Sequence, residues 1–308
     1  SGNAIELSNG NYVIINNSWG GGKGAVTWAS GSQATIGEIS SANSLIGTLD
    51  SDHIGAYGIT PLKSGNYIIN STDWNNKAGA ITWANGTLPL TGEINISNSL
   101  IGNNPNDKIG NNGITTFASG LYAIKSTEWN NQGAITWANE NTGITGNISE
   151  TNSLLGANLN ERIAYSTIKA HANGNLVLIN WAWNNRKGAI TWIDSNTGKT
   201  GFLSSSNALV GTNDNDLVGG SIDSLLSGNL VVRSASWDNK KGAITWIGTN
   251  TELTGTINSS NSLTGTTDED RIGTNPVLSL SDSSYVIRSS HFNQRKGAIT
   301  WVKDKKAL

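Results

Sequence analysis

The sequence predicts an all-β protein, and within that class a six-bladed β-propeller with four antiparallel strands in each blade. Three observations predict this fold. A five-residue motif recurs six times at nearly constant spacing, short apolar runs and turn residues fill the intervals, and two runs in each interval are apolar on both faces. Together they indicate small β-units that are covered on both sides by their neighbours.

The repeated motif is Gly-Ala-Ile-Thr-Trp, with valine in place of isoleucine in the first copy. Its tryptophans are Trp28, Trp83, Trp137, Trp192, Trp246 and Trp301, so successive copies lie 55, 54, 55, 54 and 55 residues apart. Units of this size cannot bury an apolar face alone and must stack on one another. We therefore expect one domain over residues 1–308, with blades at approximately 1–50, 51–105, 106–160, 161–214, 215–268 and 269–308.

Each complete unit contains four short β runs, which we call A to D. In the second unit they lie at 59–62, 66–70, 79–83 and 92–95. Ser64-Gly65, between runs A and B, is typical of a tight hairpin turn. No run shows the helical period of about 3.6 residues, so we expect no substantial helix.

Runs B and C lack the alternation of a half-exposed strand and are typical of strands buried on both faces. A β-solenoid is the alternative, but its coils are usually shorter and lack tight turns such as Asn9-Gly10 and Ser119-Gly120. In the last unit, runs A, B and C end at Trp301, and no D run follows before Leu308. The last blade is therefore expected to have three strands.

Composition narrows the class of function. The formal net charge is -2, which provides no positive surface for nucleic acid or an anionic membrane. No apolar run approaches the roughly 20 residues of a membrane span. The chain has no cysteine, so it can form neither disulfides nor thiolate metal sites. It also has no methionine, even at position 1, and we expect a fragment or a mature chain.

The order of sequence motifs within the repeat resembles that of two known families. The order Gly-Asn-Tyr-Val, Trp-Asn-Asn, Gly-Ala-Ile-Thr-Trp and Asn-Ser-Leu-Ile-Gly resembles a repeat of large bacterial surface or secreted proteins of the filamentous-haemagglutinin type. This resemblance implies a bacterial protein that is secreted or displayed on the cell surface. More distantly, Leu100-Ile101-Gly102, Tyr122-Ala123-Ile124 and Gly133-Ala134-Ile135 resemble the order of an FG-GAP blade of integrin α-subunits, which implies a propeller.

The FG-GAP blade carries a calcium loop of aspartates between runs A and B. Here that place holds only a tight Asn-Gly or Ser-Gly turn. We therefore expect no bound metal and no cofactor.

Candidate ligand-binding residues gather in the B–C and D–A loops, which emerge on the same face of a four-stranded antiparallel blade. The B–C loop repeats an aromatic residue: Trp19, Trp74, Trp129, Trp183, Trp237 and Phe292. In four of the five units whose aromatic is tryptophan, a short polar residue follows it: Asn75, Asn130, Asn184 and Asp238. The D–A loop repeats an acid: Asp52, Asp107, Glu161, Asp216 and Asp270.

This face supports two interpretations. In the first, the protein is a multivalent carbohydrate binder, a lectin or adhesin. Its aromatic rings stack on pyranoses, the amides and acids bind hydroxyls, and weak sites gain by avidity. In the second, the aromatics cover the gaps between blades and the acids cap turns by accepting from backbone N–H groups. The protein would then be a structural spacer or a protein–protein interaction module with no small ligand.

Two further sets of residues recur in the repeats, the tryptophans of the repeated motif and the lysines before run C. The tryptophans that close the repeated motif share strand parity with the preceding Val or Ile, so we expect them in the core between blades. A lysine before run C recurs as Lys23, Lys77, Lys187, Lys241 and Lys296. Together with Arg186, Lys240 and Arg295, these cations are either solvated hairpin tips or part of a site for sialylated or sulfated glycans.

Catalysis has little support in the sequence. His53, His171 and His291 occupy unrelated positions of the repeat, and no nucleophile–base or metal-ligand spacing emerges. The units keep nearly equal lengths, whereas an enzyme usually interrupts such symmetry at one site. We therefore expect that the protein is not an enzyme.

Overall fold

The computed structural model describes residues 3–171, 173–248, 252–282 and 284–303. Six β-sheets form, one for each repeat, and none of them closes on itself. The first four sheets have five strands, the fifth has four and the last has three. The predicted all-β fold class, with six units and a three-stranded last sheet, is confirmed. Among these residues, no helix has the length and apolar character needed to cross a membrane.

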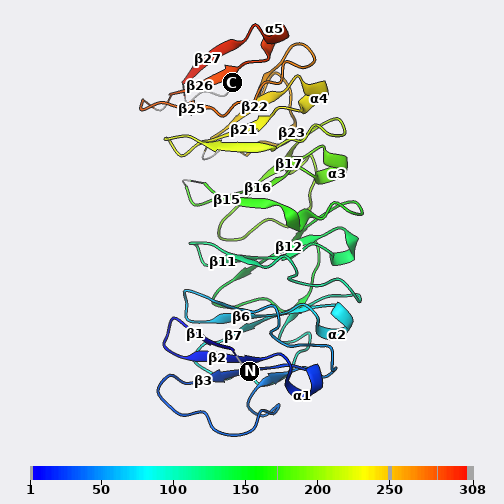
Figure 1. The fold of residues 1–308 in the computed structure, drawn as a ribbon, viewed down its shortest axis with the longest axis vertical. Coiled ribbons are helices and arrows are strands. Elements are labelled where there is room, and N and C mark those ends of the chain that lie inside the picture. Colours follow the sequence, from blue (N-terminus) through cyan, green and yellow to red (C-terminus); the bar gives the residue numbers. More distant parts are fainter. Residues whose placement is uncertain (1–2, 172, 249–251, 283, 304–308) are drawn as a thin grey trace. The chain divides into compact units, whose positions relative to one another are not determined.

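The chain divides into two compact units. The first comprises Ser1–Tyr165 and Asn196–Phe202, and the second comprises Ser166–Ser195 and Leu203–Leu308. Each unit is described by itself, with the element labels of Figure 1.

The first unit holds repeats one to three. Repeat one contains β1 (Asn3–Glu6), β2 (Tyr12–Asn16), α1 (Trp19–Gly22), β3 (Ala25–Ala29) and β4 (Leu45–Ile46). Repeat two contains β5 (Ile59–Pro61), β6 (Tyr67–Ser71), α2 (Trp74–Lys77), β7 (Ala80–Ala84), β8 (Gly92–Glu93) and β9 (Leu100–Ile101). Repeat three contains β10 (Ile114–Thr116), β11 (Leu121–Ser126), η1 (Trp129–Asn131), β12 (Ala134–Asn139), β13 (Gly146–Asn147), β14 (Ser153–Leu155) and η2 (Ile163–Tyr165).

Most of repeats four to six lies in the second unit. Repeat four contains β15 (Thr167–Ala170), β16 (Leu176–Asn180), α3 (Trp183–Arg186), β17 (Ala189–Ile193), β18 (Gly201–Phe202) and β19 (Leu209–Val210), of which β18 belongs to the first unit. Repeat five contains β20 (Ser221–Ser224), β21 (Leu230–Ser234), α4 (Trp237–Lys240), β22 (Ala243–Ile247), β23 (Gly255–Thr256) and β24 (Leu263–Thr264). Repeat six contains β25 (Leu278–Ser279), β26 (Ser284–Ser289), α5 (Phe292–Arg295) and β27 (Ala298–Lys303).

The burial of run B on both faces has a direct cause in the packing of repeats. All five residues of β6 are buried. Side chains of a strand alternate between its two faces. Tyr67 and Ile69 pack in a cluster with Val13 and Val26 of repeat one. Ile68, between them, packs in a cluster with residues of repeat three, among them Tyr122, Ile124 and Trp129.

The fourth strand of each sheet differs from the prediction. Run D was placed at 92–95, and that assignment is wrong. The strand that pairs antiparallel with β7 is β9, with Ile81 opposite Leu100. Gly92 and Glu93 form β8, which pairs in parallel with β4 of the preceding repeat. Leu100 is fully buried whereas Glu93 is exposed, so the apolar segment takes the place inside the sheet.

We call β8 and its counterparts in the other repeats crossing strands, because each pairs with the sheet of the preceding repeat. These strands link neighbouring repeats through the main chain. The parallel pairs are β4 with β8, β9 with β13, β14 with β18, and β19 with β23. In each pair the second strand comes from the repeat that follows. At its start, the N–H of Gly92 donates to the carbonyls of Ser41 and Ser44 at 2.9 and 3.0 Å. Each of the first four sheets is therefore completed by its successor.

The tryptophans that close the repeated motif form a second link. The indole N–H of Trp83 donates to the carbonyl of Glu140 at 2.9 Å, in the loop of the next repeat. A Cβ built on Gly143 of that loop would lie 2.4 Å from Trp83 Cβ, so a larger residue cannot follow the same path. Trp28 donates in the same way to Gly86 and Trp137 to Lys199.

The predicted position of this series between repeats is confirmed for five of its six members. Trp28, Trp83, Trp192 and Trp246 are partly buried and pack against core clusters, and Trp137 is 5% exposed. Trp301 is the exception, since it is 58% exposed. Its indole N–H bonds to Ser284 Oγ at 3.0 Å, within its own sheet.

We predict that Trp83→Phe weakens the contact between repeats two and three. The variant keeps an aromatic ring but leaves the carbonyl of Glu140 without the indole donor. The expected loss is about 1 kcal/mol of unfolding free energy, measured by chemical denaturation. Trp301→Phe is the matched control, because its indole bond joins no second repeat, and it should lose clearly less. Equal losses in the two variants would contradict the proposed link.

Candidate functional site

The B–C loop is a tight left-handed turn, which is drawn as a short helix in Figure 1. In repeat two, Asn75, Asn76 and Lys77 have φ angles of 50°, 55° and 63°. The N–H of Gly79 closes the turn on the carbonyl of Trp74 at 3.0 Å. A left-handed backbone costs an L-residue about 1–2 kcal/mol, and glycine and asparagine tolerate it best.

This backbone explains the pair of short polar residues after the aromatic. Repeat one places Gly20 and Gly21 at the two positions, with φ of 63° and 82°. Repeat five places Asp238 and Asn239 there, with φ of 45° and 55°. Glycine, asparagine and aspartate therefore share a conformational requirement at these positions. The sequence analysis treated the amides as ligand groups and missed this common cause.

The repeated aromatic residues of the loop lie mainly in the core. Trp129, Trp183 and Trp237 are 8%, 6% and 9% exposed, while Trp19, Trp74 and Phe292 are partly buried. The ring of Trp129 belongs to a cluster with Ile81 and Ile109 of the preceding repeat. The buried rings consequently contribute apolar surface to the contact between repeats.

The repeated acid bridges two repeats. Asp107 Oδ2 accepts from the N–H groups of Asn103 and Asn104 at 2.9 and 2.8 Å, in its own loop. Its Oδ1 accepts from the N–H of Asn130 at 3.0 Å, in the left-handed turn of the next repeat. We call this bridging carboxylate the acid clasp.

Four acids form the clasp with nearly the same geometry: Asp52, Asp107, Asp216 and Asp270. Each of them is at most 3% exposed. Glu161 has a longer side chain and accepts from the N–H of Ala157 and the amide of Asn158, both in its own loop. The turn-capping alternative of the sequence analysis thus matches the observed bonds. It extends further, because each of the four carboxylates also holds the next repeat.

The clasp has an electrostatic signature at Asp270. Burial raises the pKa of this carboxyl, but donors from Thr267, Asn293 and Thr266 outweigh burial and lower the pKa to about 2. A carboxylate that accepts several N–H bonds favours its charged form. Asp270 is therefore ionised within the protein at neutral pH.

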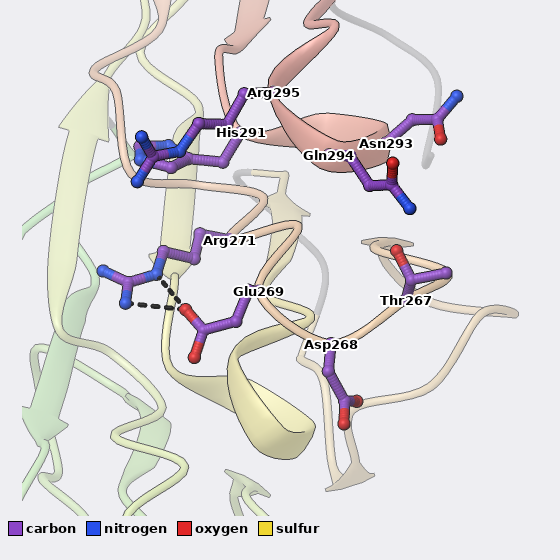
Figure 2. A pocket seen from close by; sticks show the side chains of 8 residues that line it. All are labelled: Thr267, Asp268, Glu269, Arg271, His291, Asn293, Gln294 and Arg295. Atoms are coloured by element: carbon purple, nitrogen blue, oxygen red, sulfur yellow. Dashed lines mark hydrogen bonds and ion pairs between the residues drawn. The ribbon is translucent and has the colours of Figure 1, made fainter.

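A pocket of about 500 Å³ lies between the D–A loop after β24 and the turn of repeat six. Figure 2 shows the basic side chains Arg271, His291 and Arg295 on one side of it. The residues on its other side are Thr267, Asp268, Asn293 and Gln294.

The acidic partner of Arg271 in this pocket is Glu269. The Arg271 guanidinium bonds to Glu269 Oε2 at 2.7 Å, and Lys240 Nζ bonds to Oε1 at 2.8 Å. Lys240 first and then Arg271 lower the pKa of Glu269. Arg295 and His291 also line the pocket, and neither forms an ion pair with an acid among the residues that the structure describes.

A second pocket, of about 310 Å³, occupies the equivalent place one repeat earlier. It lies between the D–A loop after β19 and the turn of repeat five. Its lining comprises Arg186, Asn213, Asp214, Asn215, Asp216, Leu217, Ser236, Asn239 and Lys240. The two pockets share a location next to a clasp but differ in their charged residues.

The structure brings the predicted residues together but uses most of them internally. Acid, turn residue and aromatic do meet, since the clasp joins acid to turn. The groups that line the pockets include Arg271, which the sequence analysis did not select. Its signal was available, because the residue after the acid changes along the chain, from Lys108 to Leu217 to Arg271. Arg295 is one of the cations that the sequence analysis named before run C, whereas His291 was set aside there. Among the described residues, no three His, Asp or Glu side chains form a group that could hold a metal ion.

We predict that Asp270→Asn destabilises the second unit in a pH-dependent way. The folded-state pKa of about 2 lies below the ordinary value of 3.8, so the stabilisation is fully present above about pH 4 and disappears as pH falls toward 2. At pH 7 the variant should lose about 1.5–3 kcal/mol, measured by urea unfolding, and near pH 2 the two proteins should converge.

Asp268→Asn is the control for this experiment, because Asp268 is exposed and lies two residues away in the same loop. It should change little at any pH. A loss in Asp270→Asn that is the same at pH 7 and pH 2 would contradict an ionised clasp.

We predict that the second residue of the left-handed turn, Asn76 in repeat two, matters for its backbone conformation and not for its amide group. Asn76→Gly removes the amide but permits the left-handed φ, and should change the unfolding free energy by less than about 0.5 kcal/mol. Asn76→Val should cost about 1–2 kcal/mol, because a β-branched residue disfavours that φ. Thermal melting compares the two variants, and equal effects would show that the amide itself matters.

We compared the chain with protein-family models, with curated proteins and with solved structures. A model of the family described as "Repeat of unknown function (DUF5650)" matches residues 6–56, 61–111, 116–165, 170–220, 224–274 and 279–308. The search of curated proteins found no match. Among solved structures, the chain is similar to oligopeptidase B from Trypanosoma brucei with covalently bound antipain in its closed form, at 8% identity and a TM-score of 0.37. That alignment covers 98% of this chain and 39% of the other, so the chain spans about two fifths of its length.

The family model covers most of the chain and confirms a six-fold repeat of about 50 residues. The finer resemblances to filamentous haemagglutinin and to FG-GAP blades stay predictions. The chain belongs to the family of the Repeat of unknown function (DUF5650).

Proposed function

We propose that this chain is a structural and protein-interaction module. In this role the repeated residues hold the repeats together, and the residues that vary around the turns contact a partner. The observation that carries the proposal is the acid clasp, in which a repeated candidate ligand group accepts three backbone hydrogen bonds across two repeats.

The burial of the aromatic residues supports the same role. A ring that stacks on a sugar needs one open face. Trp129, Trp183 and Trp237 are each at most 9% exposed, and exposing such a ring would forfeit roughly 1.5–3 kcal/mol or more of apolar burial. Placement of the protein on a bacterial surface, or outside the cell, is part of the proposal and rests on the resemblance of the repeat alone.

Binding of acidic carbohydrate is a second candidate function, favoured by the larger pocket. Its volume of about 500 Å³ suits a small ligand. The guanidinium groups of Arg271 and Arg295 have the planar donor geometry that pairs with carboxylate or sulfate. Asn293 and Gln294 add amides that can bond to hydroxyls. A sialylated or sulfated glycan would match this combination.

We predict the outcome of a glycan-array screen of the purified chain, run with and without calcium. The module proposal expects no binding to any glycan at high protein concentration. Binding to acidic glycans that is lost at least tenfold in Arg295→Gln would instead establish the second candidate.

Lys77→Gln is the matched control for that variant. Lys77 is exposed and holds the same turn position in repeat two that Arg295 holds in repeat six. An equal loss in both variants would indicate a general charge effect and would argue against a site in the pocket.

A further inference from the structure

Repeat four differs from its neighbours between its B strand and its left-handed turn. Trp181 lies between β16 and α3, two positions before the repeated aromatic, where repeats two and three have Thr72 and Thr127. These threonines are at most 1% exposed, and Thr72 Oγ1 donates to the carbonyl of Ile109 at 3.0 Å. Trp181 is 50% exposed instead. Repeat four therefore places a large aromatic ring at the surface, where the two preceding repeats bury a small polar side chain.

A cation of the following turn lies over the Trp181 ring. The guanidinium carbon of Arg186 is 5.6 Å from the ring centroid, within the range of a cation–π interaction. Among the residues that the structure describes, no acid forms an ion pair with Arg186. Its planar set of N–H donors is therefore available to the two oxygens of a carboxylate. Tryptophan and arginine are also the residue types enriched at the energetic centres of protein interfaces.

Arg186 connects this ring to the pocket of about 310 Å³ between repeats four and five, because it also lines that pocket. Three exposed asparagines belong to the same lining: Asn213, Asn215 and Asn239. A side-chain amide offers both a donor and an acceptor, which are the groups that a peptide main chain needs. We call the surface formed by Trp181, Arg186 and the three asparagines the Trp181 surface.

We propose that the Trp181 surface binds an extended peptide segment of a partner protein, in which a carboxylate side chain stands next to an apolar or aromatic one. The carboxylate pairs with the guanidinium of Arg186, and the apolar side chain packs on the exposed part of the Trp181 ring. The asparagine amides bond to the main chain of the segment. This inference rests on the proposed module role and adds the chemistry of the partner.

The charges of the pocket lining favour a peptide over a strongly anionic chain. Lys240 is bonded to Glu269 Oε1 at 2.8 Å, and Asp216 is a clasp acid that accepts from main-chain N–H groups. The remaining charges of the lining are Arg186 and the exposed Asp214, one of each sign. A sulfated polysaccharide would be repelled by Asp214, whereas a peptide segment needs to place only one carboxylate at Arg186.

The experiment selects short random peptides displayed on phage for binding to the purified chain. The selected peptides are synthesised, and their Kd values are measured by fluorescence anisotropy. They should carry Asp or Glu next to an apolar or aromatic residue. Trp181→Thr, which restores the residue of repeats two and three, and Arg186→Gln should each weaken binding roughly tenfold or more. Tyr57→Ala is the control, because Tyr57 is 51% exposed and lies in the first unit, and it should bind as the wild type does.

Substitution in the peptide tests the pairing with Arg186 directly. Exchanging the peptide's Asp or Glu for Asn or Gln should weaken binding to the wild type roughly tenfold. The same exchange should change binding to Arg186→Gln little, because the group that it pairs with is already absent. If circular dichroism shows that Trp181→Thr does not fold, Arg186→Gln and the exchanged peptides decide the outcome.

Three results would overturn the proposal. Peptides that bind both variants as tightly as the wild type would remove this site and leave the module role intact, and so would a selection that yields no binding peptide. Binding to a glycan array that Trp181→Thr abolishes would instead establish a carbohydrate site, and the module role would fall together with the peptide site.

Discussion

The bridging carboxylate is the interaction on which the rest of this structure depends. A left-handed turn of two or three residues is unfavourable for an L-amino acid chain. The clasp acid accepts from the N–H of the residue after the aromatic and so holds that turn against the preceding repeat. The same carboxylate satisfies two N–H groups of its own loop. An unpaired carboxylate in this buried position would be costly, so loop and turn stabilise each other.

The residues that form the clasp and the turn recur from repeat to repeat, whereas the residues beside them vary. Acid, aromatic and short polar residues recur because each has a structural task, whether bridging, filling the contact or permitting positive φ. Positions beside them are free to change, and the pockets next to the clasps are lined by different charges in repeats five and six. In the module role that we propose, the varied positions contact the partner, since replacing them leaves the links between repeats intact.

The links also give each repeat a direction. One face carries the isoleucine and tryptophan of the repeated motif, and the other carries two alternate residues of the B strand, which are Tyr67 and Ile69 in repeat two and Tyr122 and Ile124 in repeat three. A crossing strand, an indole bond and a clasp all connect a repeat to its successor. Because the two faces differ, each contact between neighbouring repeats joins two unlike surfaces.

The sequence by itself determined the repeat period, strands A to C of each unit, the burial of run B on both faces and the meeting of the acid with the B–C turn. These features follow from local patterns of apolar and turn residues. Only the tertiary structure decided that Gly92 and Glu93 join the preceding sheet, that Trp129 faces the core, and that Asp107 bonds main-chain N–H groups rather than solvent. The pairing of a two-residue strand, the direction of a ring and the partners of a carboxylate depend on groups dozens of residues away. Similarly, the left-handed turn became recognisable only once the glycines, asparagines and aspartate of different repeats were seen in one conformation.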